Sequence, residues 1–349
     1  MSGVLLRLAC TTTMAAQAVL VPAPAAAVPE PQQSVAQLLT NLQQLYRRTE
    51  QAIETYNGTA NLLKQQSAQV SRLDGELARA RLALQDSRAD AGRLARQQYQ
   101  SSTGLGPYVR LLLAPDPEHA LDEGHVIGEL ERDRARTVSR LTTSEQRKDA
   151  LARAARKALD TQLTLTDQQK KQHDEVRARL ADVERLLAGL TPAQLAAIAV
   201  LEQRNVTAAQ QKLTTAGALP TARSATPAGN RAVRYAMDQV GKPYEWGAEG
   251  PDAYDCSGLT AQAWSHAGTP IPRTSQEQWQ RLKRIPLSEL RPGDLVVYFP
   301  DATHVAMYVG DGRVVHAPRP GDAVKVSPLA SYPVLGAVRP DQAPATDAR

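Results

Sequence analysis

An apolar seam with coiled-coil spacing runs from Val35 to Leu94 and restricts what the first third of the chain can fold into. Its members recur at alternating intervals of three and four residues, and residues 32–106 contain no proline. A mean period of about 3.5 residues places them on one stripe of a long helix. They are Val35, Leu38, Leu42, Leu45, Thr49, Ala52, Tyr56, Thr59, Leu63, Val70, Leu73, Leu77, Ala80, Leu84, Ala91 and Leu94.

A second seam of the same kind follows in the next third of the chain. It comprises Val138, Leu141, Ala152, Ala155, Leu159, Val176, Leu180, Val183 and Leu187. Two long helices can bury such stripes by folding back on each other. The sequence therefore predicts an all-α antiparallel coiled-coil hairpin over residues 32–213. Its last part is a further helix that starts at Thr191 and Pro192, a favourable capping pair.

The segment between the seams, residues 101–128, has a different character. Gly104, Gly106 and Pro107 should end the first helix, and the apolar run Tyr108–Leu113 follows. The two seams cannot bury this run. We expect an apolar tip, which either folds onto itself as a small cap or serves as a docking surface.

The first 27 residues have the features of a signal peptide. Arg7 precedes an apolar stretch, and Ala25-Ala26-Ala27 offers a small-residue cleavage site. No later stretch has the roughly 18 apolar residues that span a bilayer, so we expect a secreted, extracellular or wall-associated protein. Of the two cysteines, Cys10 would leave with the signal. Cys256 would then be a lone thiol in an exported protein, either inert and buried or reactive.

Charge and composition exclude some classes of function. The net charge of +5 lies in the helical part, because residues 229–349 hold 13 Lys/Arg and 13 Asp/Glu. A mild excess of this kind usually marks a solvated helical surface, and no basic run is dense enough to predict nucleic-acid binding. We expect no metal and no cofactor.

The pattern changes after a Thr-, Ala- and Pro-rich linker at residues 214–228. Residues 229–340 indicate helices at 231–240 and 256–267, and then short strands at 294–299, 304–309, 314–316, 324–326 and 334–338. Helices followed by an antiparallel meander give an α+β domain. Residues 341–349 resemble a disordered tail.

Cys256 has the local setting of a nucleophile. Asp255-Cys256-Ser257-Gly258 leads into the second predicted helix, and a helix N-terminus stabilises a thiolate. A cysteine hydrolase also needs a base, usually an imidazole. His266 lies at the far end of the same helix, which leaves His304 and His316 on the predicted strands.

These motifs resemble those of NlpC-type papain-like cell-wall endopeptidases. The resemblance covers about 110 residues. It rests on Asp255-Cys256-Ser257-Gly258-Leu259, on His304 to Gly310 and on Val314 to Ala317. Gly241 to Gly247, Pro272 to Ser275 and Arg291 to Leu295 are similar to further landmarks. One departure is Gly247-Ala248, where the family often has two glycines.

The resemblance implies a role for each residue of the site. Cys256 would be the nucleophile, His304 the base and His316 the residue that orients it, although His316 can also be read as a structural histidine. Tyr244 would join the oxyanion hole. Asp255 and Ser257 would bind the stem peptide, and Asp255 can equally be the N-cap of its helix. Arg273 and Ser275 are weaker candidates for substrate contact. Trp246 and Trp264 are expected to be core residues.

We therefore expect a peptidoglycan endopeptidase that cuts stem peptides, between D-glutamate and the diamino acid, by a Cys-His-His mechanism. The alternatives are a catalytically silent wall-binding or divisome scaffold, and an amidase or acyltransferase of the same fold. The helical hairpin ahead of this domain resembles that of wall hydrolases controlled by the division-associated FtsEX transporter, which implies a membrane partner at the tip.

Overall fold

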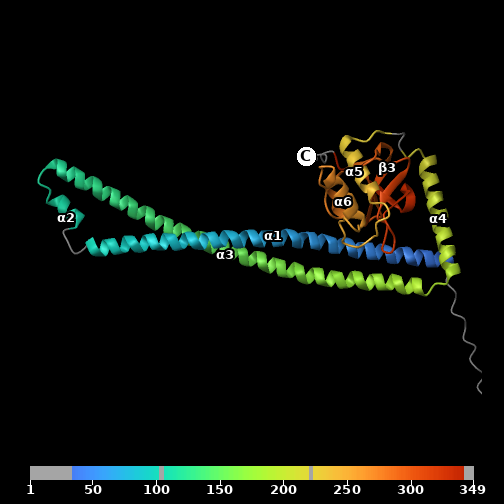
Figure 1. Ribbon diagram of the computed structural model, residues 1–349, viewed down its shortest axis with the longest axis horizontal. Coiled ribbons are helices and arrows are strands. Elements are labelled where there is room, and N and C mark those ends of the chain that lie inside the picture. The colour runs from blue at the N-terminus through green and yellow to red at the C-terminus, as the bar shows by residue number, and fades with distance from the viewer. Residues whose placement is uncertain (1–33, 102–105, 220–222, 342–349) are drawn as a thin grey trace, which may run out of the picture.

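The computed structural model describes residues 34–101, 106–219 and 223–341, and the expected signal peptide lies outside these ranges. Two long helices, α1 (Val35–Ser101) and α3 (Pro117–Ala188), run side by side as the expected antiparallel hairpin (Figure 1). The short helix α2 (Pro107–Leu112) lies at its far end.

The tip is smaller than the predicted segment 101–128. The side chain of Asp116 accepts a hydrogen bond from the backbone of His119, and Pro117 takes the first helical position. This is a favourable helix start, so residues 117–128 are the first turns of α3. The apolar side chains of α2 are exposed, with Leu112 83% and Leu113 67% accessible.

The helix α4 (Pro192–Thr215) crosses the other end of the hairpin. It begins with a capping box between Thr191 and Gln194. Its Ile198 packs against a cluster at the base of the hairpin that contains Leu38, Leu42 and Val183. In the described ranges, no single helix is long and apolar enough to cross a membrane. Only α3 and α4 together, bent by 111°, meet that test.

The C-terminal domain is α+β, as predicted, but its sheet is not a simple meander. Its helices are α5 (Pro227–Asp238), α6 (Cys256–His266) and α7 (Ser275–Arg281). The strands are β1 (Lys283–Ile285), β2 (Leu295–Tyr298), β3 (His304–Gly310), β4 (Arg313–His316), β5 (Lys325–Pro328) and β6 (Val334–Arg339), in the antiparallel order β1-β6-β2-β3-β4-β5.

The sequence reading missed β1 and α7, which are too short to show a period. It also placed the start of the domain two residues after Pro227, where α5 begins, and assigned Asp341 to the tail. Asp341 is still part of the domain, because it accepts hydrogen bonds from Thr226 and Arg291.

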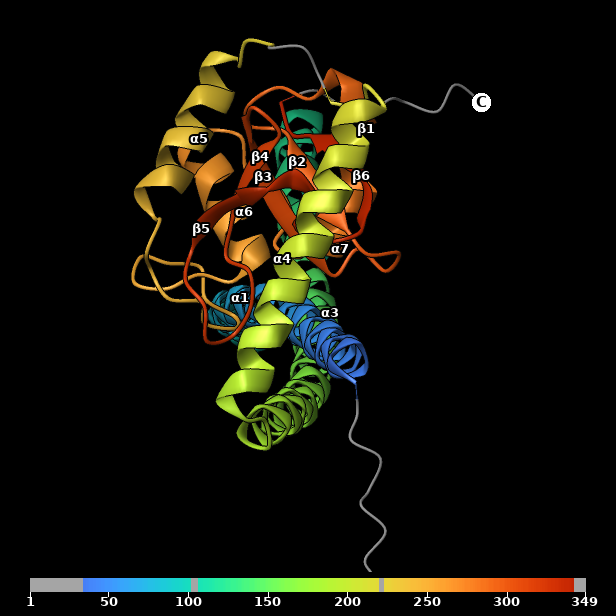
Figure 2. The same ribbon diagram turned by 90° about the vertical axis from the view of Figure 1, so that its right-hand side faces the viewer.

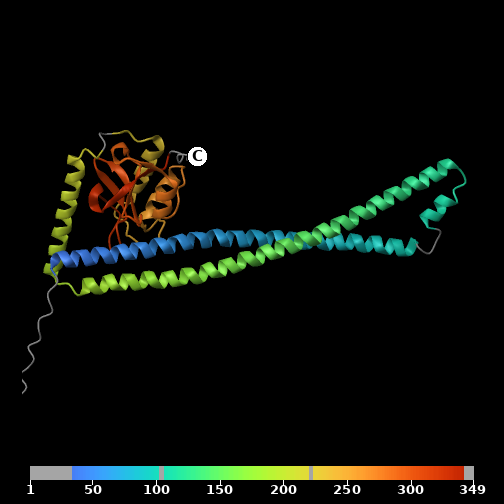
Figure 3. The same ribbon diagram turned by 180° about the vertical axis from the view of Figure 1, so that it is seen from behind.

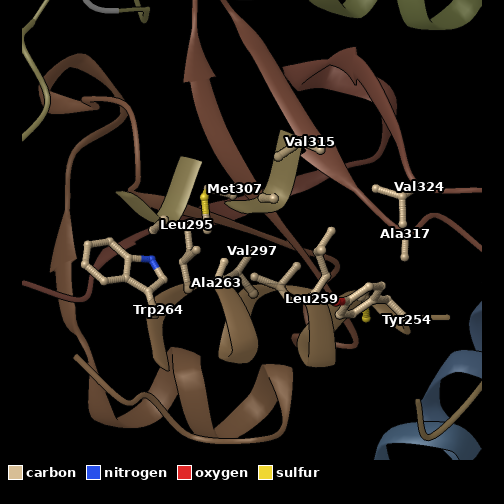
Figure 4. Close-up of a cluster of buried hydrophobic side chains, with 14 of the residues drawn as sticks. Tyr254, Leu259, Ala263, Trp264, Leu295, Val297, Met307, Val315, Ala317 and Val324 are labelled. Atoms are coloured by element: carbon tan, nitrogen blue, oxygen red, sulfur yellow. The ribbon is translucent and has the colours of Figure 1, made fainter. Parts of the chain in front are cut away.

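Side chains alternate between two cores on the two faces of this sheet. Leu295, Val297 and Met307 pack with α5 and α6, around Trp264 and Leu259 (Figure 4). Val296, Tyr298 and Tyr308 face the other way, where Leu213 of α4 and Leu219 pack against them. The predicted linker at 214–228 is therefore shorter than expected and is held against the domain where the structure describes it.

The domain lies along the N-terminal half of α1, at the opposite end from α2 (Figures 1 and 3). Figure 2 shows α1 beneath the domain and α4 along one side of the sheet. Arg47 pairs with Asp301 at 3.3 Å, and the rings of Tyr56 and Trp246 meet edge to face at 5.0 Å. Tyr56 belongs to the predicted seam of α1, so this member of the seam packs on the domain as well as on α3.

Candidate active site

Cys256 is the first residue of α6 and lies in the core beneath the sheet. Its helix is capped by Asp255, whose carboxylate accepts from the backbone N–H of Gly258 at 2.6 Å. A Cβ on Gly258 would lie 2.3 Å from the carbonyl oxygen of Ala248, so only glycine allows the loop before α6 to approach this closely. The helix start and the loop together fix the position of the sulfur.

The two candidate base residues form a hydrogen-bonded chain on adjacent strands. His304 Nε2 lies 2.9 Å from His316 Nδ1, and His316 Nε2 lies 3.0 Å from Ser327 Oγ. His304 is fully buried and His316 nearly so. Burial, and then the neighbouring His304, hold the pKa of His316 well below its usual range. A neutral His316 can accept or donate one hydrogen bond at each ring nitrogen, which fixes the ring of His304. The sequence reading did not include Ser327.

The other ring nitrogen of His304 is directed away from this chain. Within the described ranges, His304 Nδ1 is buried without a hydrogen-bond partner. It is therefore the atom left over to exchange a proton with a reacting group. Val305, the residue after His304, packs in the same buried cluster as Cys256, and its backbone lowers the pKa of the thiol. The cysteine therefore lies against the start of β3, the strand that carries His304.

Tyr244 is the third predicted group near the sulfur. Its side chain is buried in the same core cluster as Cys256. Burial, and then the negative charge that Cys256 would carry, raise the pKa of its phenol well above the usual range. The phenol therefore keeps its proton and can donate a hydrogen bond.

The predicted substrate residues form one buried polar network. Arg273 pairs with Asp255 at 2.6 Å and donates to Ser257 Oγ at 2.9 Å. Asp255 is therefore both the helix cap and the partner of a buried guanidinium. The backbone N–H of Ser275 lies in the same buried region. Trp264 is a core residue, as predicted, and Trp246 is half-buried against the same core and also contacts the hairpin.

The C-terminal domain is similar in sequence to a known protein family. Residues 241–335 match the NlpC/P60 family. This chain has an NlpC/P60 domain. A probable endopeptidase of Corynebacterium glutamicum is 43% identical over 122 residues, which are 34% of this chain and 58% of that protein. The peptidoglycan endopeptidase RipA of Mycolicibacterium smegmatis is 39% identical over 111 residues, 28% of this chain and 22% of RipA.

Among solved structures, the NlpC/p60 domain of the peptidoglycan hydrolase SagA is 32% identical. The match covers 32% of this chain and 97% of that chain, with a TM-score of 0.30. The chain spans only about half of the first curated relatives, 58% and 54% of their lengths. The residues that match the family, 241–335, lie within the C-terminal domain.

Three residues of α1 enter the site of the NlpC/P60 domain, and the sequence reading missed them. Glu54 accepts from Ser257 Oγ at 2.6 Å and from the Ser275 backbone at 2.8 Å. Asn57 donates to Asp255 at 3.0 Å. Glu50 Oε1 lies 3.3 Å from His304 Nδ1, although without hydrogen-bond geometry.

These α1 residues alter the pKa of the candidate nucleophile, Cys256. Cys256 Sγ lies 3.8 Å from Glu54 Oε1, and the residue is only 2% exposed. Burial, Glu54, Asp255 and Glu50 raise the pKa of the thiol well above its usual range, against the opposing effect of the Val305 backbone. The arrangement therefore holds Cys256 as a neutral thiol.

A sequence signal for these residues existed. Glu50, Glu54 and Asn57 are spaced by four and three, so they share one helical face. The apolar seam is also weakest beside them, where Thr49, Ala52, Tyr56 and Thr59 replace leucines. Nothing in the spacing, however, identifies the surface that this second stripe contacts.

Proposed function

We propose that the protein is a peptidoglycan endopeptidase that cuts stem peptides by a Cys256-His304-His316 thiol mechanism. The observation that carries the proposal is the buried arrangement of these three residues. A cysteine at a helix start packs against the beginning of β3, where one ring nitrogen of His304 lies 2.9 Å from a second histidine. The names of the related endopeptidases support the same reaction class.

The reaction follows from the positions of these groups. His304 Nδ1 takes the proton of Cys256, and the sulfur attacks the peptide carbonyl carbon. The backbone N–H of Cys256 and the hydroxyl of Tyr244 stabilise the oxyanion. His304 then gives its proton to the leaving amine. Water, activated by the same imidazole, releases the acyl group from sulfur. His316 keeps the tautomer and the angle of His304.

The bond we assign is the amide between D-glutamate and the diamino acid. The support is chemical: D-glutamate is linked there through its side chain, which leaves a free α-carboxylate close to the bond that breaks. Ser257, the Ser275 backbone and the nearby Arg273 provide donors and positive charge for such a group. Asp255 would hold the peptide from the other side.

We also propose that the protein is secreted and that α2 binds a membrane partner, such as a division-associated transporter of the FtsEX kind. The support is the residue 1–27 sequence and the exposed apolar side chains of α2 and the start of α3, including Leu112, Leu113 and Leu121. A patch of this kind on a monomer usually marks an interaction site.

The test is digestion of purified sacculi by a chain that carries Glu54→Ala, which removes the α1 carboxylate beside Cys256, with the released fragments identified by mass. We expect fragments that end in D-glutamate and new amino groups on the diamino acid. Cys256→Ala is the matched control and should release none while keeping its helical circular dichroism. Cleavage between the sugar and the first amino acid would instead show an amidase. Release of fragments by Cys256→Ala would refute the thiol mechanism.

A further inference from the structure

The carboxylate of Glu54 has a hydrogen-bond donor of the NlpC/P60 domain at each of its two oxygens. Its Oε1 accepts from Ser257 Oγ at 2.6 Å, and its Oε2 accepts from the Ser275 N–H at 2.8 Å. Arg273, which donates to Ser257 at 2.9 Å, adds positive charge beside it. Glu54 itself is only 3% exposed.

These donors belong to the domain. Without α1 the Ser275 N–H would lose its acceptor, and Ser257 Oγ would keep only Asp255, at 3.3 Å. The same donors can then bind another carboxylate in place of water. The proposed substrate has one, the α-carboxylate of its D-glutamate, near the amide that Cys256 attacks. Glu54 Oε1 lies 3.8 Å from Cys256 Sγ, so its site is within the length of one glutamate residue of the attacking sulfur.

Open space flanks Glu50 and Glu54 on both sides, which indicates that α1 crosses a longer cleft. Glu54, Arg273 and Thr274 line a groove of about 780 Å³. Glu50 lines a second cavity of about 320 Å³, which Tyr332 and Arg319 also line. Between the two, Cys256 and His304 are covered. A peptide that lay along the cleft would have to pass through the position of α1.

We propose that α1 is a built-in competitor of the substrate: the Glu54 carboxylate occupies the site of the stem-peptide α-carboxylate, and the enzyme is latent until residues 50–57 leave the cleft. Glu50 lies beside the proposed base, His304, and Asn57 donates a hydrogen bond to the helix cap, Asp255. Residues 50–57 therefore fill the substrate position and contact both of these groups. The inference rests on the proposed function for the identity of the competing ligand.

The first experiment measures access to the thiol and needs no substrate. In full chains that carry Cys10→Ser, the rate of Cys256 alkylation by iodoacetamide is followed by mass. Glu54→Ala removes the hydrogen bonds of a buried charged group and should raise this rate about tenfold or more. Asn57→Ala should raise it less. Asp74→Ala, an exposed acid on the same helix, is the matched control and should leave it unchanged.

The second experiment tests the mimicry with the Glu54→Ala chain. A dipeptide product that ends in D-glutamate should slow alkylation, and the same dipeptide with an α-carboxamide should not. Equal protection by both would overturn the mimicry. Alkylation of Glu54→Ala at the parental rate would overturn the latency. Fast alkylation of Glu54→Ala without any cleavage of stem peptide would refute the proposed function while leaving the latency intact.

Discussion

At the scale of single residues, His304 and His316 differ in what their ring nitrogens contact. His304 has one nitrogen free of hydrogen bonds among the described residues, whereas both nitrogens of His316 are engaged, by His304 and Ser327. In the proposed mechanism, His304 is therefore the residue that moves a proton to and from the reacting groups, and His316 acts through it.

We predict that His304→Ala lowers kcat/KM by about a hundredfold or more, the usual contribution of a general base. His316→Ala should cost less, because His304 keeps its proton-transfer atom and loses only its orientation. Steady-state cleavage of a soluble stem peptide, measured in a Glu54→Ala background, compares the two. A greater loss of kcat/KM in His316→Ala would mean that His316 is the base and His304 the orienting residue.

The titration of Glu54 gives the latent state a pH dependence. Burial, and then the charge of Asp255, raise the pKa of Glu54 to about 7, against the opposing effects of Ser257, Arg273 and the Ser275 backbone. Cys256 and Glu50 also face this group. Once α1 leaves the cleft, an exposed Glu54 returns to an ordinary pKa near 4.5.

The sign follows from proton uptake. Between these two pKa values the closed state binds more protons, so closure is strongest at low pH and weakens as pH rises through about 7. We predict that the ratio of Cys256 alkylation in the parent to that in Glu54→Gln increases from pH 5 to pH 8. The ratio cancels the titration of the thiol itself. A constant ratio would contradict the prediction.

At the scale of elements, α1 has two stripes with different partners. One packs on α3, with Leu77, Ala80 and Leu84 buried. The other is polar and contacts the NlpC/P60 domain through Glu50, Glu54 and Asn57. Polar contacts of this kind separate more readily than an apolar core, because water replaces their partners. The second interface is therefore the one suited to opening.

Tyr56 supplies the aromatic part of that interface. Its ring lies 5.0 Å from Trp246, edge to face, and Trp246 lies 5.4 Å from His173 of α3. Such a pair contributes about 0.5–1.5 kcal/mol. We predict that Tyr56→Ala raises the Cys256 alkylation rate several-fold, about what that energy allows. Tyr56→Phe keeps the ring and should behave as the parent. Equal rates in all three chains would show that the ring pair does not hold α1.

At the scale of the whole molecule, one continuous helix joins the cleft to the tip. The 67 residues of α1 include Glu54 near one end and lead to α2 at the other. At 1.5 Å per residue, about 70 Å separate them. A partner that bends or twists the hairpin at α2 therefore acts on the helix that fills the cleft, while α4 keeps its own bonds to the domain through Gln210.

We predict that replacing Leu112 and Leu113 with lysine abolishes localisation to the proposed partner without changing the cleavage of soluble stem peptide in a Glu54→Ala background. The side chains are exposed, so the fold does not depend on them. Microscopy of tagged chains and a rate assay measure the two effects. A matched pair at Leu82 and Leu163, also exposed, controls for added charge on the hairpin. Normal localisation of the tip variant would argue against α2 as the docking surface.

The sequence by itself determined the long helical hairpin and the α+β domain, and it is the basis on which Cys256 is proposed as the nucleophile. These features rest on local information: periodicity, caps and short motifs within one segment. Cys256 with Asp255 is such a motif, and the buried helix cap follows directly from it. The short elements β1 and α7 have too few residues to show a period, so their existence depended on the packing around them.

Only the tertiary structure decided what covers the cleft. Glu54 and Ser257 are 203 positions apart, and their contact depends on how the whole domain lies on α1. A helical stripe of Glu50, Glu54 and Asn57 reads in the sequence as a solvated face, because spacing shows which residues share a side and not what meets that side. The docking of two separately folded parts turned three surface residues of a rod into occupants of an active site.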